Sequence, residues 1–155
     1  MRRRERAVTD TADIFAILQR CQVVRLGLCR NGVPYIVPMN FACALENGQF
    51  VFYVHCANAG KKLDILRENP QVCMEADCGH ALVESAQACR HRFRYASVIA
   101  QGRAEILQDA EEKAQALTLL MRWQTGRDMP VTAAQAAAVT VVRIAADEIT
   151  GKQHI

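Results

Sequence analysis

The sequence has no long hydrophobic run. No apolar stretch approaches the roughly 20 residues that a membrane-spanning helix needs. The start is basic, with four arginines and one glutamate in residues 1–6, but polar residues follow it where a signal peptide would have its apolar core. These absences predict a cytoplasmic protein that does not act on a membrane.

The basic start is not continued. Beyond residue 6 the charges almost balance, and no stripe of cations with interleaved aromatic residues follows. Binding to nucleic acid through Arg2 to Arg6 is therefore the weaker hypothesis, and a solvated N-terminal lead-in is the favoured one.

Paired cysteines of the C-x-x-C type are also missing. The seven cysteines are odd in number and irregularly spaced, which predicts reduced thiols rather than a disulfide framework. Five possible zinc ligands lie within 20 residues, but their spacing matches no common zinc site: Cys73, Cys78, His80, Cys89 and His91. We expect no metal.

The chain's length and its hydrophobic content of 51% predict one folded domain over residues 1–155. Alternating apolar residues predict strands over 23–29, 34–44, 49–55, 71–76, 93–107 and 140–145. Asn31-Gly32 and Asn47-Gly48 are hairpin signals, and Gly102 indicates a bulge. Residues 77–80 are expected to form a loop.

Four helices are expected between or beside these strands. They begin at Asp10 (or Thr9), Gly60, Asp109 and Thr132, and Gly126 ends the third. Strands that follow one another in hairpins predict an antiparallel sheet. The expected fold class is therefore mainly β, an antiparallel barrel or sandwich with peripheral helices.

The stretch from Val54 to Pro70 carries a possible anion site. Gly60, Lys61 and Lys62 open a helix, where backbone N–H groups carry partial positive charge. His55 stands where a Walker loop needs its first glycine, and no Ser or Thr follows the lysines. The pattern thus favours a single phosphate over a nucleotide triphosphate.

Pro34 and Pro38 interrupt an otherwise regular strand. Since proline offers no N–H to a sheet, the strand is either an ordinary edge or an edge that faces a planar ligand. His55 shares a strand face with Tyr53, so it is either a structural histidine or a functional one. Cys56 follows it directly, which gives a Cys–His hydrolase little support.

Three segments together resemble a known family. They are Gly32-x-Pro34-Tyr35-x-Val37-Pro38-x-x-Phe41, His55-x-Ala57-x-x-Gly60-Lys61-Lys62-x-x-x-Leu66-x-x-Asn69-Pro70 and Tyr95-x-Ser97-Val98-x-x-x-Gly102. With the tail Ile149 to Lys152, they resemble the flavin-binding split-barrel superfamily related to pyridoxamine-phosphate oxidases, and within it the nitroimidazole-resistance branch.

That resemblance implies a six-stranded antiparallel split β-barrel that forms a homodimer with FMN at the interface. It places the phosphate on Lys62 and Lys61, and the flavin ring along the backbone of Val37, Pro38, Met39 and Asn40. Ser97 and Val98 would also contact FMN. His55 would lie beside the flavin, as the catalytic candidate, with Tyr53 near it.

Trp123 lies late on the third helix and is either a residue that reaches the partner's site or a core residue.

The hypothesis that follows from the resemblance is an FMN-dependent oxidoreductase that reduces a small electron-poor acceptor such as a nitroimidazole. The alternative is a non-catalytic flavin- or haem-binding protein for carriage or sensing.

Overall fold

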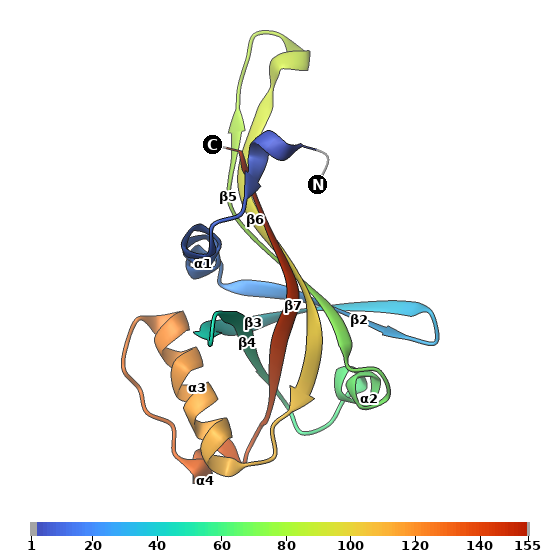
Figure 1. The fold of residues 1–155 in the computed structure, drawn as a ribbon, viewed down its shortest axis with the longest axis vertical. Coiled ribbons are helices and arrows are strands. Elements are labelled where there is room, and N and C mark those ends of the chain that lie inside the picture. The colour runs from blue at the N-terminus through green and yellow to red at the C-terminus, as the bar shows by residue number, and fades with distance from the viewer. Residues whose placement is uncertain (1–2, 155) are drawn as a thin grey trace.

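Six antiparallel strands close into a ring in the computed structural model, which describes residues 3–154 (Figure 1). The ring runs β7–β4–β3–β2–β5–β6 and closes through pairing of β6 with β7. Its strands are β2 (Val23–Arg30), β3 (Val33–Glu46), β4 (Gln49–Cys56), β5 (Gln71–Val83), β6 (Arg92–Ile106) and β7 (Thr140–His154). A two-residue strand, β1 (Ala7–Val8), pairs with β7. The predicted split barrel is confirmed.

The first two hairpins turn where the sequence predicts. Asn31 and Gly32 have φ of 52° and 77°, and Asn47 and Gly48 have φ of 51° and 83°. Two central residues with positive φ are what a type I′ turn requires, and this turn matches the twist of the flanking strands. The turns therefore set the β2–β3 and β3–β4 registers locally.

Four helices lie outside the ring. They are α1 (Thr11–Arg20), α2 (Lys61–Glu68), α3 (Ala110–Thr125) and α4 (Ala133–Ala136), with short 3₁₀ turns η1 (Arg4–Arg6) and η2 (Ala88–Arg90). Asp10 and Asp109 each accept two backbone N–H bonds at the start of α1 and α3. Thr132 and Gln135 form a capping box on α4, and Gly126 ends α3 with φ of 69°.

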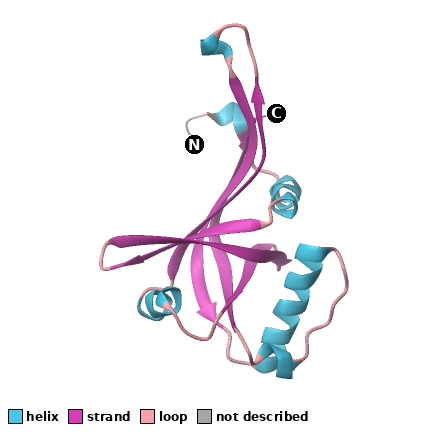
Figure 2. Cartoon of the chain, turned by 180° about the vertical axis from the view of Figure 1, so that it is seen from behind, coloured by secondary structure: helices cyan, strands magenta, loops and turns pink. Residues whose placement is uncertain are grey.

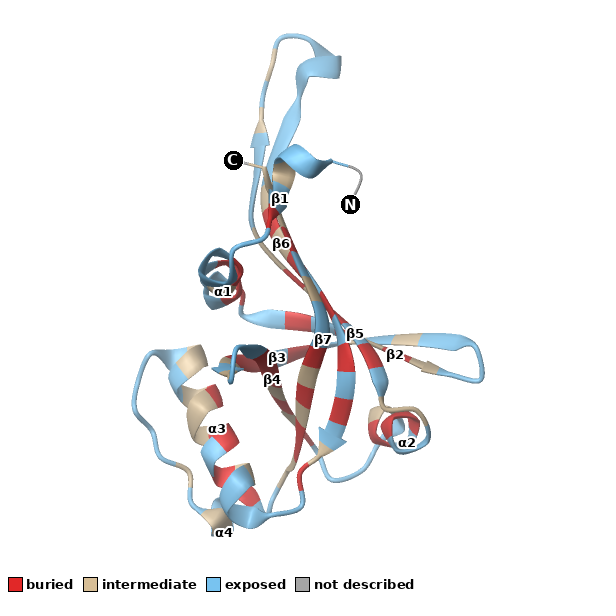
Figure 3. Ribbon diagram, viewed as in Figure 1, coloured by how far each residue is buried: buried red, intermediate tan, exposed pale blue. Residues whose placement is uncertain are grey.

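Two apolar clusters hold these elements together. The larger fills the barrel, where Leu26, Phe41, Phe52 and Ile144 are fully buried. The smaller lies under α3 and α4 on the outer face of the ring and includes Leu107, Leu117 and Val141. Figure 3 shows the alternation of buried and exposed residues along the central strands. α3 thus covers one side of the barrel.

The region predicted as a loop, residues 77–80, is instead strand. β5 continues to Val83 and pairs with β6, with a register shift between Cys78 and Ala81. Gly79 has φ of 69° within this bulge. The extra residues of the bulge break the alternation of apolar and polar residues in the sequence. The sequence pattern therefore does not predict a strand here, although β5 stays paired with β6. The outer part of this hairpin projects from the barrel as an arm (Figure 2).

The last strand is also longer than predicted. Alternation ends near Ala145, but β7 continues to His154 because it pairs with β6 from Tyr95 to Ile106. Gly102 lies at a register shift in that pairing, where the extra residue, Asp147, is on β7. The predicted irregularity at Gly102 is therefore confirmed. A Cβ on Gly102 would lie 2.1 Å from the carbonyl oxygen of Ala145. Only glycine allows the two strands to approach so closely here.

None of the helices within residues 3–154 has both the length and the apolar character needed to cross a bilayer.

Candidate functional site

The first half of β3 is an open sheet edge. Residues 33–40 pair with β2, whereas pairing with β4 begins only at Phe41. Among residues 3–154, no other strand lies along this half of β3. Its backbone groups on that side are therefore available to a ligand, as the two prolines predict.

The prolines also fix which backbone groups face the open edge. Pro34 lies opposite Cys29 and Pro38 lies opposite Arg25. Because proline has no N–H, neither residue can exchange both bonds with β2, so the intervening residues make the ladder. The N–H groups of Ile36 and Asn40 then point to the open edge, as do the carbonyl groups of Pro34, Ile36 and Pro38.

Two glutamine contacts hold β3 where it passes from β2 to β4. The side chain of Gln124 donates to the carbonyl oxygens of Phe41 (2.8 Å) and Gln22 (3.2 Å). Asn40 donates its side-chain amide to the same Gln22 carbonyl (3.2 Å). The end of α3 therefore anchors this part of the edge. No sequence pattern distinguishes Gln124 from a surface glutamine.

α2 begins beside this edge without a side-chain cap. Its N-cap residue is Gly60, at φ of 138°, and no side chain accepts its first N–H groups. These groups are left to solvent or to an anion. Lys62, in the first turn, lines the same pocket as Cys56. Burial raises the pKa of the Cys56 thiol, and the positive charge of Lys62 opposes the rise. The thiol stays protonated at neutral pH, which argues against a cysteine nucleophile.

His55 carries a buried polar atom with no partner. Its Nδ1 makes no hydrogen bond within residues 3–154. A buried polar atom left without a partner costs about 1–3 kcal/mol, and a bound ligand or an ordered water is one way in which such an atom is satisfied. His55 therefore has a vacant hydrogen-bonding position.

These features meet in one open pocket with a volume of about 310 Å³. It is lined by Val37, Pro38, Met39, Asn40, His55, Cys56, Ala57 and Lys62. The structure thus brings together six of the predicted site residues and adds Cys56 and Ala57. An edge of peptide groups, a cation and an uncapped helix start can hold a flat ring carrying a phosphate.

Lys61 and Tyr53 point elsewhere. Lys61 lies over the ring of Tyr35, with its Nζ 4.5 Å from the ring centroid. The Tyr53 hydroxyl is hydrogen-bonded to Glu46, which also pairs with Arg143 at 2.7 Å. Tyr53, Glu46 and Arg143 line a different pocket, of about 460 Å³, between the barrel and α3. Burial and the bond to Glu46 raise the pKa of Tyr53 to about 12.

Trp123 packs in its own chain. Its ring lies edge-on to Phe15 at 5.5 Å between centroids and tilted against Phe41 at 5.7 Å. Its Nε1 is buried and has no partner within residues 3–154. The core role is the one its surroundings support.

Ser97 and Val98 lie on β6 outside the pocket. Val98 is buried in the barrel core, and Ser97 lies opposite Lys152 on β7. Neither lines the pocket formed by β3, β4 and α2.

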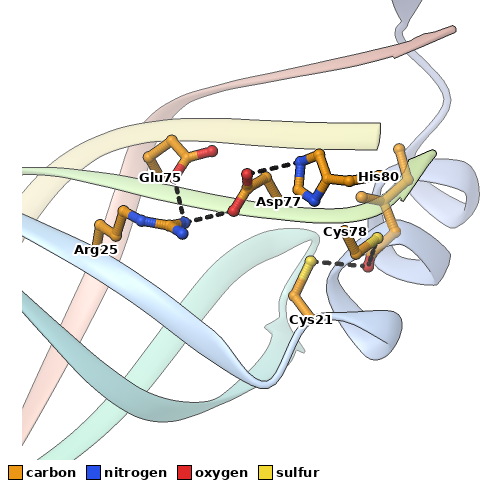
Figure 4. A network of polar contacts seen from close by, with 7 residues as sticks. Cys21, Arg25, Glu75, Asp77, Cys78 and His80 are labelled. Carbon is orange, nitrogen blue, oxygen red and sulfur yellow. Dashed lines mark hydrogen bonds and ion pairs between the residues drawn. The ribbon is translucent and has the colours of Figure 1, made fainter. Parts of the chain in front are cut away.

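The possible zinc ligands are dispersed (Figure 4). His80 contacts Asp77 at 2.9 Å, and Asp77 also pairs with Arg25, which bonds Glu75 at 2.9 Å. Cys78 turns toward Cys21 instead, and both thiols contact the carbonyl oxygen of Ile17. The other three are exposed on the surface: Cys73, Cys89 and His91.

A family model described as pyridoxamine 5′-phosphate oxidase matches residues 10–153. The chain belongs to this family. Its fold is thus the flavin-binding split barrel of the pyridoxamine 5′-phosphate oxidases. Among proteins with curated descriptions, none matches this chain.

Solved structures agree with that membership. A candidate 5-nitroimidazole antibiotic resistance protein from Bacteroides thetaiotaomicron is 30% identical, with a TM-score of 0.82 over 95% of this chain and 86% of that one. The flavocytochrome Anf3 from Azotobacter vinelandii is 26% identical, with a TM-score of 0.80 over 100% of this chain and 72% of that one. An FAD-binding protein from Mesorhizobium loti, 21% identical over 97% and 98% of the two chains, has a TM-score of 0.68 and shows the fold alone.

Proposed function

We propose that this member of the pyridoxamine 5′-phosphate oxidase family binds FMN in the pocket between β3, β4 and α2. In this proposal it reduces a small electron-poor acceptor there, a nitroimidazole-type nitro group being the favoured class. The observation that carries the proposal is the convergence of an open strand edge, an unpartnered His55 nitrogen and Lys62 on one pocket. The similarity to a candidate nitroimidazole-resistance protein supports the choice of acceptor.

The residues present fit the two ends of FMN. The ammonium of Lys62 and the uncapped N–H groups of α2 suit a phosphate, for which charge-assisted hydrogen bonds are the strong ones. The N–H groups of Ile36 and Asn40, with the neighbouring carbonyls, suit the polar edge of the flavin ring. An arrangement of this kind binds by backbone groups, so it does not depend on side-chain identity along β3.

FMN, when bound, supplies the electron-transfer chemistry. The chain's own residues bind and orient it and shape the space for the acceptor. The His55 ring, which carries the unpartnered Nδ1, lines the pocket, and Val37 and Met39 are among its apolar lining residues. His55 is thus the residue for which we propose a role in acceptor binding or proton supply.

The proposal includes a homodimer with the flavin between subunits. The pocket is open, and Ser97 lies outside it on β6, so a second copy of the chain is the proposed source of the remaining wall. Sedimentation of the flavin-loaded protein tests this part separately from flavin binding.

The first experiment is the absorption spectrum of the purified protein, with release and identification of any flavin. We expect flavin bands, and FMN as the released species. A protein that stays colourless and does not bind added FMN contradicts the proposal. The second is stopped-flow oxidation of the reduced protein by a nitroimidazole, with free reduced FMN as the reference. We expect faster oxidation than with free FMN, and a smaller acceleration in His55→Gln.

A non-catalytic flavin or haem carrier is the second candidate function. The similarity to a flavocytochrome at 26% identity favours it, and the His55 ring that lines the pocket is of the residue type that binds haem iron. Titration with haemin tests it: a Soret shift that is lost in His55→Ala, together with no acceleration of flavin oxidation, would favour carriage.

A further inference from the structure

A third pocket, at the base of the arm, has three arginines among its six lining residues. It has a volume of about 650 Å³ and lies where η1, the start of β6 and the end of β7 meet. Its lining residues are Arg3, Glu5, Arg6, Arg92, Gln153 and His154. It shares no lining residue with the proposed flavin pocket.

Lys152 and Tyr95 extend this cationic cluster. Lys152 Nζ lies 5.7 Å from the centroid of the Tyr95 ring, and the His154 ring lies 6.3 Å from it. Slight burial would raise the pKa of Tyr95, but hydrogen bonding and charge from Lys152 and Arg6 outweigh it and lower this pKa. Arg6 and Lys152, on two different elements, thus both favour the ionised form of the Tyr95 hydroxyl.

Carboxylates do not balance these charges. Arg3 pairs with Glu5 at 3.4 Å, but within residues 3–154 no carboxylate lies within ion-pair distance of Arg6, Arg92 or Lys152. Arg6 and Lys152 are also partly buried. Crowded cations repel one another, and partial burial weakens their screening by water. A bound anion would relieve this repulsion.

The cluster is held in place by the sheet. β1 pairs with β7, so that Ala7 lies opposite Lys152 and Val8 opposite Gly151. A Cβ on Gly151 would lie 2.9 Å from Cβ of Val8, so the segment that carries Arg6 packs closely on β7. The backbone next to Arg6 and at Lys152 is therefore held in the sheet.

His154 adds a ring nitrogen to the same pocket. Its Nδ1 is 2.7 Å from the carbonyl oxygen of Phe93 on β6. With Nδ1 donating to that carbonyl, Nε2 is the ring nitrogen left for a ligand. Arginine forks bind phosphate oxygens two at a time, and a histidine beside them can add a further hydrogen bond.

We propose that this pocket binds the phosphate group of a small molecule, either free or as the phosphate of a nucleotide. The cations converge on one pocket, whereas nucleic-acid sites spread them along a stripe or groove that follows the backbone. The proposal is independent of the flavin pocket and does not require the enzyme activity.

Isothermal titration of the purified full-length protein with pyrophosphate and with AMP tests the proposal. We expect a site for each probe that Arg6→Gln and Arg92→Gln weaken at least tenfold, distinct from any binding of the probes at Lys62. Arg127→Gln is the matched control, since Arg127 is an exposed arginine in the segment after α3 and does not line this pocket. Lys62→Ala is the second control and should leave this binding unchanged. Circular dichroism establishes that each variant is folded.

The two probes separate the sources of the phosphate. Tighter binding of AMP assigns the site to a nucleotide, with Tyr95 as the neighbouring ring, and equal or tighter binding of pyrophosphate assigns it to free phosphates. No binding of either probe at millimolar concentration overturns the proposal. Loss of binding in Lys62→Ala but not in Arg6→Gln also overturns it, and so does tight binding of a DNA duplex without binding of the small probes.

Discussion

Lys61 and Lys62 follow one another in the sequence, yet their ammonium groups lie in different places. Lys62 lines the pocket beside His55, whereas Lys61 lies over the Tyr35 ring at 4.5 Å. Successive helix residues point about 100° apart, so one helix start cannot aim both side chains at the same anion. Lys61 instead links α2 to the β2–β3 hairpin that carries the open edge.

Replacing Lys62 is therefore expected to affect flavin binding far more than replacing Lys61. Lys62→Ala removes a charge-assisted contact worth about 1.5–3 kcal/mol, which corresponds to roughly 10- to 100-fold weaker FMN binding. Lys61→Ala removes an exposed cation–π contact worth about 0.5–1 kcal/mol, and this loss should lower the stability of the fold rather than FMN affinity. Fluorescence titration with FMN measures the first effect and thermal unfolding the second. Equal weakening by both variants would contradict this assignment of roles.

Tyr53 and Tyr95 are expected to ionise in widely separated pH ranges. Burial and the bond to Glu46 raise the pKa of Tyr53 to about 12, whereas Lys152 and Arg6 lower that of Tyr95 against a small opposing effect of burial. In an alkaline pH titration followed by tyrosinate absorbance near 295 nm, Tyr95→Phe should remove the step at the lowest pH. Tyr53→Phe should remove the step at the highest pH. The reverse order would show that these contacts are absent in solution.

The raised pKa of Tyr53 also has a consequence for stability. The pKa of tyrosine in the unfolded chain is about 10, so below that pH the neutral Tyr53 phenol makes its full contribution to the free energy of unfolding. It is lost as the pH rises through about 12, because the unfolded chain then releases this proton first. Between pH 10 and 12, wild type should lose more stability than Tyr53→Phe, as measured by urea unfolding.

Trp123 is expected to act on stability rather than on the flavin. Its contacts with Phe15 and Phe41 place it against the core, so Trp123→Ala should destabilise by about 3 kcal/mol, the low end for a large core residue because the ring is only partly buried. Trp123→Phe keeps much of the packing and removes the buried Nε1, so it should cost less and leave FMN affinity unchanged. A large loss of FMN affinity in a stable Trp123→Phe protein would favour a role at the partner's site.

Gly102 should tolerate no side chain. Gly102→Ala would place a Cβ 2.1 Å from the Ala145 carbonyl oxygen, which forces β6 and β7 apart. Gly27→Ala is a graded control, because its Cβ would lie 3.1 Å from the Cys73 carbonyl oxygen. We expect Gly102→Ala to lower the unfolding temperature much more than Gly27→Ala. Similar losses for the two variants would mean that the bulge relaxes easily.

Local chemistry made most of the barrel predictable. Asn31-Gly32 and Asn47-Gly48 specify their turns through positive φ, and Asp10 and Asp109 specify helix starts through side-chain oxygens. The parts that were missed depend on distant partners. Residues 77–80 and the end of β7 are strand because β6 lies alongside them, and neither has an alternating pattern of its own.

The site was predictable to the same extent. Pro34 and Pro38 marked the open edge because proline chemistry is local, and Gly60-Lys61-Lys62 marked the helix start. Alternation correctly put Tyr53 and His55 on one face of β4, but it could not show that Tyr53 packs with the α3–α4 cluster while His55 lines the pocket beside β3. The cationic pocket was also out of reach, because the pairing of β1 with β7 brings Arg6 to Lys152.

β7 has a further consequence for how the chain is made. It pairs with β1, β4 and β6, and every one of these partners precedes it in the sequence. On the ribosome the ring therefore stays open until residues 140–154 have been synthesised. During that time β4 and β6 present unpaired edges, which are the surfaces that recruit other chains. Nascent chains that stop before residue 140 are thus expected to need chaperones or to aggregate.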